Sequence, residues 1–373
     1  MDAPPSAVWS DVDVVGAFAA TYADARAKFL AAAARRGLAV ETHEHPRTGP
    51  DGGMLAVDVA VLGQGTAEAA LVLTSAAHGV EGFCGSGCQV ALLEDDAFVA
   101  HAQRRGVAVV FVHALNPWGF AHLARTTEDN VDLNRNFRDF GTLARNDAYL
   151  EVHPFIVPAA WPPAPDNEAR MTAYVAQRGI GALQDAVSTG QSDRPDGLFF
   201  AGTRPTWSHG VLRDVLRRHG AHRARLGWID YHTGLGPRGH GEKIFAGPDD
   251  AGMLARVRAW WGADVTSIYD GSSTSAKVTG MLFRAALEEC PSTEYTGIAL
   301  EYGTLPLPQV MQALRARQWL ANQGDAVVPQ REAVLRLTRD AFYTDTPAWK
   351  AMVAGQSRAA ALQALAGLSG RPT

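Results

Sequence analysis

The sequence has 373 residues, 47% of them hydrophobic and 20% charged, and its formal net charge is −5 at pH 7. This composition is typical of a globular protein with a substantial core, and the length suits one large α/β domain or two ordinary ones. The net negative charge argues against nucleic acid as a partner, because neutralising phosphates requires a basic surface.

Little in the chain points to a membrane or to secretion. No run reaches the roughly 18 apolar residues that span a bilayer. The N-terminus, MDAPPSAVWSDVDVV, has acids and prolines instead of a basic region followed by an apolar stretch. The cysteines are few and odd in number (Cys84, Cys88 and Cys290), so a disulfide framework is not expected. We therefore expect a cytoplasmic location and no membrane partner.

In chain order, the first predicted elements are strands that lead into a glycine-rich turn. LAVDVAVLG (55–63) alternates apolar and polar residues, and LVLTSA (71–76) follows after a break, which predicts a hairpin-like pair of strands. CQVALLEDD (88–96) has helical periodicity. VAVVFVHAL (107–115) is a continuous apolar run, which is typical of a buried strand.

Strands and helices continue to alternate in the second half of the chain. Residues 140–165, rich in proline and aromatics, predict an irregular loop, and Asp166 is expected to cap a helix that ends near Ser188. RLGWIDYH (225–232) predicts a strand that ends in a histidine. The remaining predicted elements are strands at EKIFA, VTSIY and TGIALEYG, helices at 249–261 and 281–290, and a helical C-terminal tail from 309 onward.

This alternation predicts an α/β fold with one mixed, mostly parallel central sheet covered by helices on both faces. No linker marks a domain boundary, so we expect a single domain over residues 1–373, with its core at about 55–310 and terminal helices packed on it. Ligands of such folds bind at the carboxyl ends of the strands. His78, His232 and Glu301 all fall at predicted strand ends.

A metal site is one interpretation of the stretch SAAHGVEGFCGS. His78 and Glu81 lie three residues apart on a tight turn, and hydrolytic zinc commonly has two histidines, one carboxylate and an open water position. His232 is the best third ligand because it also ends a strand. The alternative is an ordinary strand end followed by a glycine turn.

Two further groups suit hydrolysis. Glu301 follows the buried run Ile298-Ala299-Leu300, and a carboxylate there is costly unless it is paired or functional. An edge salt bridge is the alternative for this residue. LARTTEDNVDLNRNF (123–137) has neither helical nor strand periodicity and is dense in polar groups, which favours a binding loop over a surface charge cluster. Its arginines offer planar forks that can hold a carboxylate.

The order and rough spacing of His78-x-x-Glu81, Asp132-Leu-Asn-Arg-Asn-Phe137, His232 and Glu301 resemble the zinc carboxypeptidase superfamily over about residues 55–310. The stretches NPWGF, DYHTGLG and LEYGT are similar to those of a bacterial branch of metallopeptidases whose substrates are mostly unknown.

This resemblance implies one Zn²⁺ per chain, bound by His78, Glu81 and His232, with a water at the open position. It implies that Glu301 is the general base that deprotonates this water. Asp132 would accept a hydrogen bond from the ring of His78.

The resemblance also implies the groups that hold the substrate. Arg125 would steady the tetrahedral oxyanion, and Asn134 and Arg135 would hold a terminal carboxylate. The tyrosine that many carboxypeptidases bring over the substrate has only two candidates here, Tyr269 and Tyr302. The base of the specificity pocket has no clear candidate, although Gln191, residues 199–208 and His240 lie in family-like stretches.

The function expected from these residues is that of a zinc-dependent metallopeptidase or carboxypeptidase-like hydrolase, which cleaves a C-terminal peptide or amide bond with metal-activated water. One alternative is an N-acyl amino acid deacylase similar to aspartoacylase and succinylglutamate desuccinylase. These relatives usually add a C-terminal β domain, whereas the tail here is predicted to be helical. An inactive binding protein on the same fold is a third reading. The expected partner is a small peptide or N-acyl amino acid, and the oligomeric state and a metal other than zinc stay open.

Overall fold

The computed structural model describes residues 12–142, 144–324 and 326–370. Most of the N-terminal stretch on which the expectation about secretion rests lies outside these residues.

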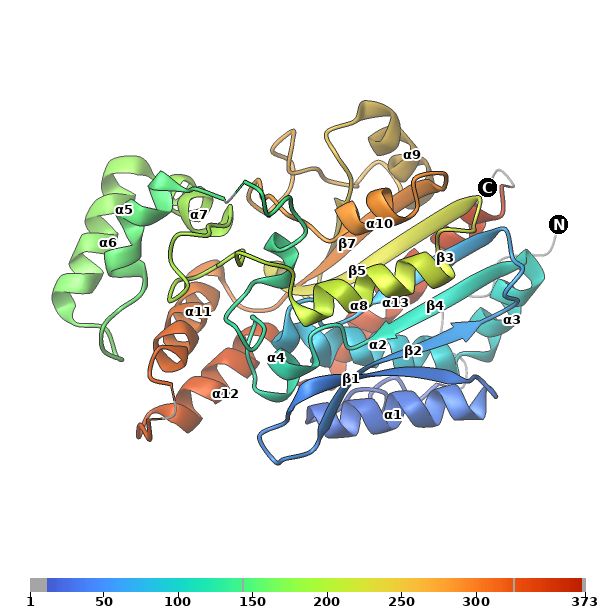
Figure 1. Cartoon of the computed structure of the whole chain (residues 1–373), viewed down its shortest axis with the longest axis horizontal. Coiled ribbons are helices and arrows are strands. Elements are labelled where there is room, and N and C mark those ends of the chain that lie inside the picture. The colour runs from blue at the N-terminus through green and yellow to red at the C-terminus, as the bar shows by residue number, and fades with distance from the viewer. Residues whose placement is uncertain (1–11, 143, 325, 371–373) are drawn as a thin grey trace.

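Helices and strands alternate around one sheet (Figure 1). The strands are β1 (Val40–Thr48), β2 (Met54–Leu62), β3 (Ala69–Thr74), β4 (Val107–His113), β5 (Arg225–Arg238), β6 (Gly241–Phe245) and β7 (Glu294–Gly303). The helices are α1 (Tyr22–Arg35), η1 (Gly79–Glu81), α2 (Gly82–Glu94), α3 (Asp96–Arg105), α4 (Pro117–Ala121), η2 (Leu133–Arg135), α5 (Asp147–Ile156), α6 (Pro165–Arg178), α7 (Ile180–Ser188), α8 (Trp207–His219), α9 (Ala251–Trp261), α10 (Phe283–Glu289), α11 (Leu307–Ala321), α12 (Arg331–Phe342) and α13 (Pro347–Leu368).

The sheet is mixed and has a parallel centre. Its strand order is β1-β2-β4-β3-β5-β7-β6. The pairs β4–β3, β3–β5 and β5–β7 are parallel, whereas β1, β2 and β6 join in antiparallel pairs towards the two edges. The predicted α/β class with a mixed, mostly parallel sheet is confirmed. That residues 1–373 form one domain, with the core at about 55–310, stays a prediction.

Central strands are buried on both faces because helices cover both. In β3, Leu71 and Leu73 pack in the core on one face, while Ala70 and Val72 pack in the core on the other. Figure 1 shows α8 and α10 in front of the sheet and α2 and α13 behind it. This two-sided burial explains why these strands are continuous apolar runs in the sequence.

Three strand assignments differ from the prediction. The strands β2 and β3 are not a hairpin pair, because β4 lies between them and pairs with both. The chain passes through α2 and α3 between β3 and β4, as parallel strands require. VTSIY (265–269) forms no strand, and only an isolated bridge joins Thr266 to Ile244. The unpredicted β1 is an edge strand, VETHEHPRT, too polar for apolar alternation to reveal it.

The loop predicted over residues 140–165 contains helix α5. The side chain of Asn146 accepts a hydrogen bond from Tyr149 N at 3.0 Å and so caps the helix. The prolines of this stretch predicted a loop because proline is usually absent from the interior of a helix, but Pro154 lies inside α5.

The helix predicted from Asp166 to Ser188 is two helices, α6 and α7. It begins at Pro165 and is interrupted at Gly179, whose φ of +87° an L residue rarely adopts. The helical tail is confirmed, because α11, α12 and α13 follow β7. Within the described residues, no helix is both long enough and apolar enough to cross a membrane.

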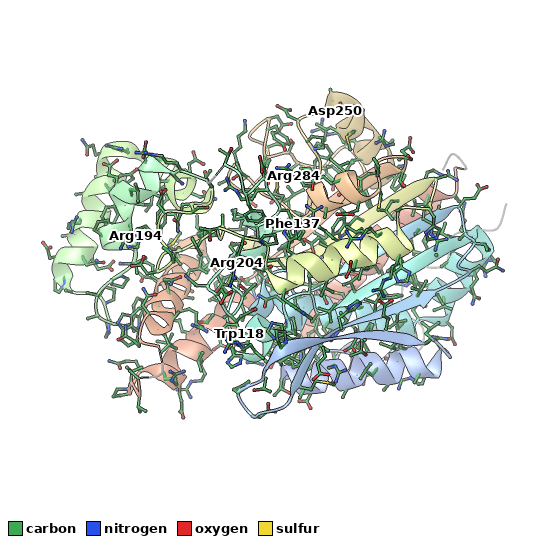
Figure 2. All side chains as sticks on the ribbon, viewed as in Figure 1. Trp118, Phe137, Arg194, Arg204, Asp250 and Arg284 are labelled. Atoms are coloured by element: carbon green, nitrogen blue, oxygen red, sulfur yellow. The ribbon has the colours of Figure 1, made fainter. Side chains whose placement is uncertain are left out.

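The carboxyl ends of β3, β5 and β7 position the predicted site. The single turn η1 follows shortly after β3, and His232 of β5 is paired with Glu301 of β7 in the ladder. The polar loop 123–137 reaches the same region, and its Phe137 (labelled in Figure 2) stacks on His209 of α8 with ring centroids 4.2 Å apart. Helices α5, α6 and α7 form an extension away from the sheet (Figure 1).

Candidate metal centre and substrate cavity

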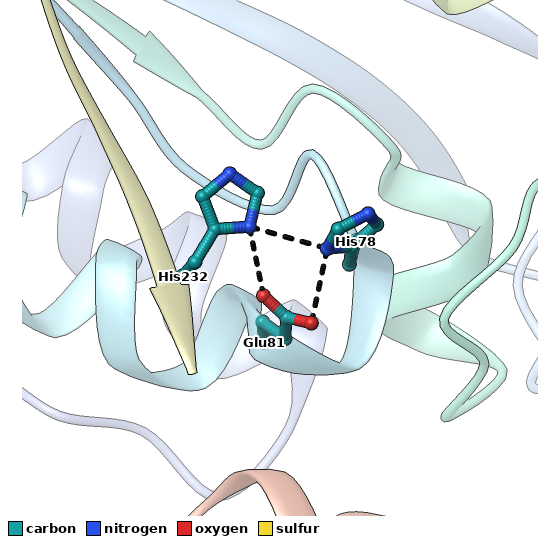
Figure 3. Close-up of side chains that lie close together, drawn as sticks. All are labelled: His78, Glu81 and His232. Carbon is teal, nitrogen blue, oxygen red and sulfur yellow. Dashed lines mark hydrogen bonds and ion pairs between the residues drawn. The ribbon is translucent and has the colours of Figure 1, made fainter. Parts of the chain in front are cut away.

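Three of the predicted residues come together as possible metal ligands. His78 Nδ1 lies 3.0 Å from Glu81 Oε1. His232 Nδ1 lies 3.1 Å from both His78 Nδ1 and Glu81 Oε2 (Figure 3). All three side chains are buried, and one ligand atom of each lies within 4.8 Å of the others.

The donor set fits a zinc ion. With zinc–ligand bonds of about 2.0–2.1 Å, ligand atoms of a tetrahedral site lie about 3.3 Å apart, which is close to the separations found here. Two imidazoles and one carboxylate leave a fourth position open, as in catalytic and not structural zinc sites.

A tight turn brings His78 and Glu81 to the same point. Gly79 packs so closely on α4 that a Cβ atom there would lie 2.1 Å from the carbonyl carbon of Gly119. The Gly79 N–H also donates to Arg125 O at 3.1 Å. The glycine after His78 is therefore required by close approach of two backbones.

Each histidine turns its other ring nitrogen to a carboxylate. His78 Nε2 lies 3.0 Å from Asp132 Oδ1, the pairing that the resemblance implied. His232 Nε2 lies 2.7 Å from Asp230 Oδ2, and Asp230 Oδ1 accepts a hydrogen bond from Thr74 Oγ1 at 2.6 Å. Sequence reasoning missed Asp230, although residues two apart in a strand share a face and WIDYH therefore offered the signal. Such carboxylates orient the ring and raise its basicity.

We expect Asp230→Asn to weaken zinc binding by about 10- to 100-fold, because the amide cannot polarise the ring of His232 as a carboxylate does. Competition with a chromophoric chelator measures this affinity. Asp214→Asn, at a partly exposed position of α8, is the matched control. Wild-type affinity in Asp230→Asn would contradict the positioning role.

Charges inside the ligand cluster favour a protonated His232 and an ionised Glu81. Burial alone would lower the pKa of His232, but Asp230 and Glu81 raise it well above its ordinary value. Burial alone would raise the pKa of Glu81, but His78, His232 and Arg125 bring it well below its ordinary value. A metal at Nδ1 of His232 therefore has to displace a proton.

We expect zinc binding at pH 7 to release at least one proton, because a raised pKa keeps His232 protonated until metal replaces the proton. Affinity should then rise about tenfold per pH unit as long as the pH stays below that pKa. Calorimetric titration in buffers of different ionisation enthalpy counts the protons. A heat of binding that is independent of the buffer would refute this expectation.

Glu301 lies beside the ligand cluster at the end of β7. Its Oε1 accepts a hydrogen bond from Leu235 N at 3.0 Å, and its side chain lines the same cavity as His78 and His232. Burial, and then the negative charge of Glu81, raise the pKa of Glu301 to about 8. A carboxylate with a pKa raised towards neutrality is suited to accept a proton and return it.

Arg125 is held at the ligands by two carboxylates. Its Nε donates to Asp132 Oδ2 at 3.0 Å, and its Nη1 donates to Glu81 Oε1 at 2.9 Å. Its Nη2 lies 2.8 Å from His78 Nε2. The guanidinium also lines the cavity, so it can stabilise negative charge that develops on a group beside the ligands.

Arg135 is a buried cation without a carboxylate partner among the described residues. Its Nε donates to Ser188 O and its Nη1 donates to Asn134 O, both at 2.9 Å. Burial lowers the pKa of Arg135 to about 10. Arg135 and the half-buried Asn134 both line the cavity. A guanidinium paired only with carbonyls is suited to bind a carboxylate from the substrate.

Phe199 lies between the two arginines, a role that the sequence did not reveal. Its ring centroid is 5.0 Å from the Cζ atom of Arg125 and 5.3 Å from that of Arg135. Its φ of +51° is unusual for a bulky residue. Gln191 supports this strained backbone, because its N–H donates to Phe199 O at 3.3 Å and its side chain donates to Leu198 O at 3.2 Å.

His78, His232, Glu301 and both arginines line one cavity of about 130 Å³. The tyrosines considered for covering the substrate do not line it. Tyr302 is fully buried, and Tyr269 donates its hydroxyl to Gly247 O at 2.9 Å. His240, considered for the specificity pocket, is exposed and is likewise not among the described residues that line the cavity.

The sequence matches one family model. The model described as "Protein of unknown function (DUF2817)" matches residues 18–356. The chain belongs to the DUF2817 family. No curated protein matches the sequence of this DUF2817 chain.

Solved structures show likeness of fold to the DUF2817 chain. Bovine thrombin-activatable fibrinolysis inhibitor, in complex with tick carboxypeptidase inhibitor, is similar at a TM-score of 0.45 and 11% identity, covering 86% of this chain and 96% of that chain. A metallo-carboxypeptidase from Burkholderia cenocepacia is similar at a TM-score of 0.39 and 14% identity, covering 85% of this chain and 66% of that chain. A succinylglutamate desuccinylase from a Silicibacter species is similar at a TM-score of 0.39 and 16% identity, covering 77% of this chain and 67% of that chain.

Proposed function

We propose that this DUF2817 protein is a zinc-dependent hydrolase of the carboxypeptidase type, which releases a residue with a free carboxylate from a small peptide. The observation that carries the proposal is one cavity lined by two of the metal-binding side chains, a carboxylate with a raised pKa and two buried arginines. Buried charged groups gathered in one cavity are costly without a function, which makes them candidates for a functional site.

The residues divide the work of hydrolysis among them. His78, Glu81 and His232 would hold the zinc ion, which when bound polarises the scissile carbonyl and lowers the pKa of a water. Glu301 accepts the proton of the attacking water and passes it to the leaving amine. Arg125 donates hydrogen bonds to the oxygen on which negative charge develops.

Arg135 and Asn134 orient the substrate by its carboxylate. A guanidinium fork binds a carboxylate through two parallel hydrogen bonds and so defines both position and direction. With the carboxylate fixed, the scissile bond is presented to Glu301 and Arg125 in one orientation, which lowers the entropic part of the barrier.

The test is hydrolysis by the zinc-loaded protein of blocked dipeptides and of N-acyl amino acids, measured side by side. Faster cleavage of the dipeptides supports the peptidase. Cleavage of the N-acyl amino acids alone would replace it by the deacylase, which uses the same carboxylate anchor. Full zinc content without hydrolysis of either class would favour an inactive binding protein. A cytoplasmic location stays a prediction.

We expect Arg135→Ala to lower kcat/KM about 100-fold or more for substrates with a free carboxylate, because an ionic hydrogen-bonded pair of about 3 kcal/mol is lost. Activity on C-terminally amidated analogues should change little. Arg204→Ala is the matched control, since Arg204 is an exposed arginine of the same region (Figure 2). Equal losses on free and amidated substrates would refute the anchoring role.

A further inference from the structure

The cavity extends from the metal ligands back along one face of the sheet. Trp228, Asp230 and His232 alternate on this face of β5, and all three line the cavity. Four residues along a strand separate Trp228 from His232, a distance of about 13 Å. Across the ladder, Asp230 is paired with Ala299 of β7, and Ala299 is paired with Ile244 of β6.

Residues 266–282, the segment between α9 and α10, form another wall of the cavity with apolar side chains. Ile268, Val278 and Met281 line the cavity from this segment, and Ile268 and Val278 cluster with Ile244 of the sheet. Glu242 fixes the segment to the sheet, since its carboxylate accepts hydrogen bonds from Thr266 Oγ1 at 2.5 Å and Thr274 N at 3.1 Å. These bonds make the wall a built surface and not a loose loop.

The same segment is tied to the carboxylate anchor. Asn134 Oδ1 accepts a hydrogen bond from Leu282 N at 3.0 Å, and Phe137 N donates to Gly280 O at 3.0 Å. The anchor and the apolar wall are therefore adjacent, and a carboxylate bound at Arg135 would lie next to that wall.

The interior offers no charge to a substrate side chain. The charged residues that line the described cavity are the ones at the catalytic end and Asp230. Both oxygens of Asp230 are already engaged by Thr74 and His232. The hydroxyl of Tyr295, deeper in the cavity, donates to Ala246 O at 2.9 Å. A charged side chain would be desolvated here without a partner.

Ala299 is the position at which the cavity opens onto the sheet. Within β7 from Tyr295 to Gly303 it is the one residue that is not buried. The whole cavity of about 130 Å³ is comparable with an engineered apolar cavity of about 150 Å³ that accommodates benzene in another protein. This volume includes the catalytic end, so the apolar part of the cavity is of the order of one side chain.

We propose that this apolar part of the cavity selects a C-terminal residue with a medium or large apolar side chain, and that Ala299 sets its depth. The proposal rests on the proposed function, because it assumes that the carboxylate of the residue is bound at Arg135. Loss of one methylene from a substrate side chain in such a pocket lowers kcat/KM about 10- to 200-fold. The kcat/KM of a substrate that ends in leucine should therefore exceed that of one that ends in glycine by at least this factor.

The first experiment compares blocked dipeptides that end in leucine, phenylalanine, glycine, aspartate or lysine, with the zinc-loaded protein. In parallel, calorimetry measures binding of the corresponding free amino acids, which does not depend on turnover. Higher kcat/KM and tighter binding for leucine or phenylalanine support the proposal. Preference for lysine or aspartate would overturn it and leave the proposed hydrolase intact.

The binding measurement separates the two proposals when no dipeptide is cleaved. Tighter binding of leucine than of lysine would still support the apolar cavity, whereas the peptidase would be refuted. Equal binding of all five amino acids would overturn the apolar selection.

Two variants locate the selectivity. Ala299→Asp should lower kcat/KM for the leucine substrate at least tenfold and raise the lysine-to-leucine ratio, because it places a carboxylate at the depth of the side chain. Ala251→Asp, at the exposed first residue of α9, is the matched control and should behave as wild type. An unchanged lysine-to-leucine ratio in zinc-loaded, folded Ala299→Asp would overturn the role of Ala299.

Discussion

Glu301→Gln should reduce kcat about 10²- to 10⁴-fold, the range that a positioned general base contributes, while zinc content stays at the wild-type level. Glutamine keeps the shape of the side chain and its hydrogen bond from Leu235 N, but it cannot take up the proton of water. Stopped assays on a blocked dipeptide measure kcat, and elemental analysis of the same preparation measures zinc.

A carboxylate elsewhere on the same strand provides the control for this variant. Glu294 begins β7 and is exposed, so Glu294→Gln should leave both turnover and zinc content unchanged. Wild-type turnover in Glu301→Gln would remove Glu301 from the mechanism. Loss of zinc in that variant would instead assign Glu301 to the metal centre.

His232→Ala should abolish tight zinc binding, and with it hydrolysis. Its Nδ1 lies 3.1 Å from a ligand atom of each of the other two residues, and no other described histidine or carboxylate belongs to this ligand group. Two remaining ligands hold zinc far more weakly than three, so a protein dialysed against buffer with a weak chelator should retain almost none. Elemental analysis measures the metal per chain, which we expect to be about one in the wild type.

His240→Ala is the matched control, because His240 follows β5 closely but is exposed and lies outside the ligand group. It should retain the wild-type zinc content. Zinc retained in His232→Ala, or absent from wild-type protein supplied with zinc, would refute the metal centre. In the second case the inactive binding protein would become the better reading.

The predicted parts of the fold are those in which local pattern and tertiary environment agree. The apolar runs of β3, β4 and β5 are buried on both faces, so their sequences alone identify them as central strands. The edge strand β1 was missed because its positions are polar, and helix α5 was missed because proline inside the predicted loop is usually incompatible with a helix. The strand β2 pairs with β4 and not with β3. This pairing depends on the connection through two helices between β3 and β4, which local sequence patterns do not predict.

The site shows the same division. His78, Glu81, His232 and Glu301 were recognisable because each follows or ends an apolar run, where a polar ionisable side chain is costly without a function. Asp230 was not recognised, and Phe199 was considered for the specificity pocket but not for a place between the two arginines. Asp230 lies inside a strand with an ordinary appearance, and Phe199 acquires its place between two arginines only through a strained turn held by Gln191.

By itself, the sequence determined the class of fold, the ends of the central strands and the identities of the residues that could bind a metal. Chemistry and periodicity are local properties, and they can be read along the chain. Tertiary structure alone decided that ligands more than a hundred and fifty residues apart lie 3.1 Å from each other, and that Asp230 orients His232. It also decided that part of the cavity is apolar, because the walls of that part come from strands, helices and a loop segment that are distant in the sequence and meet only when the whole sheet is packed.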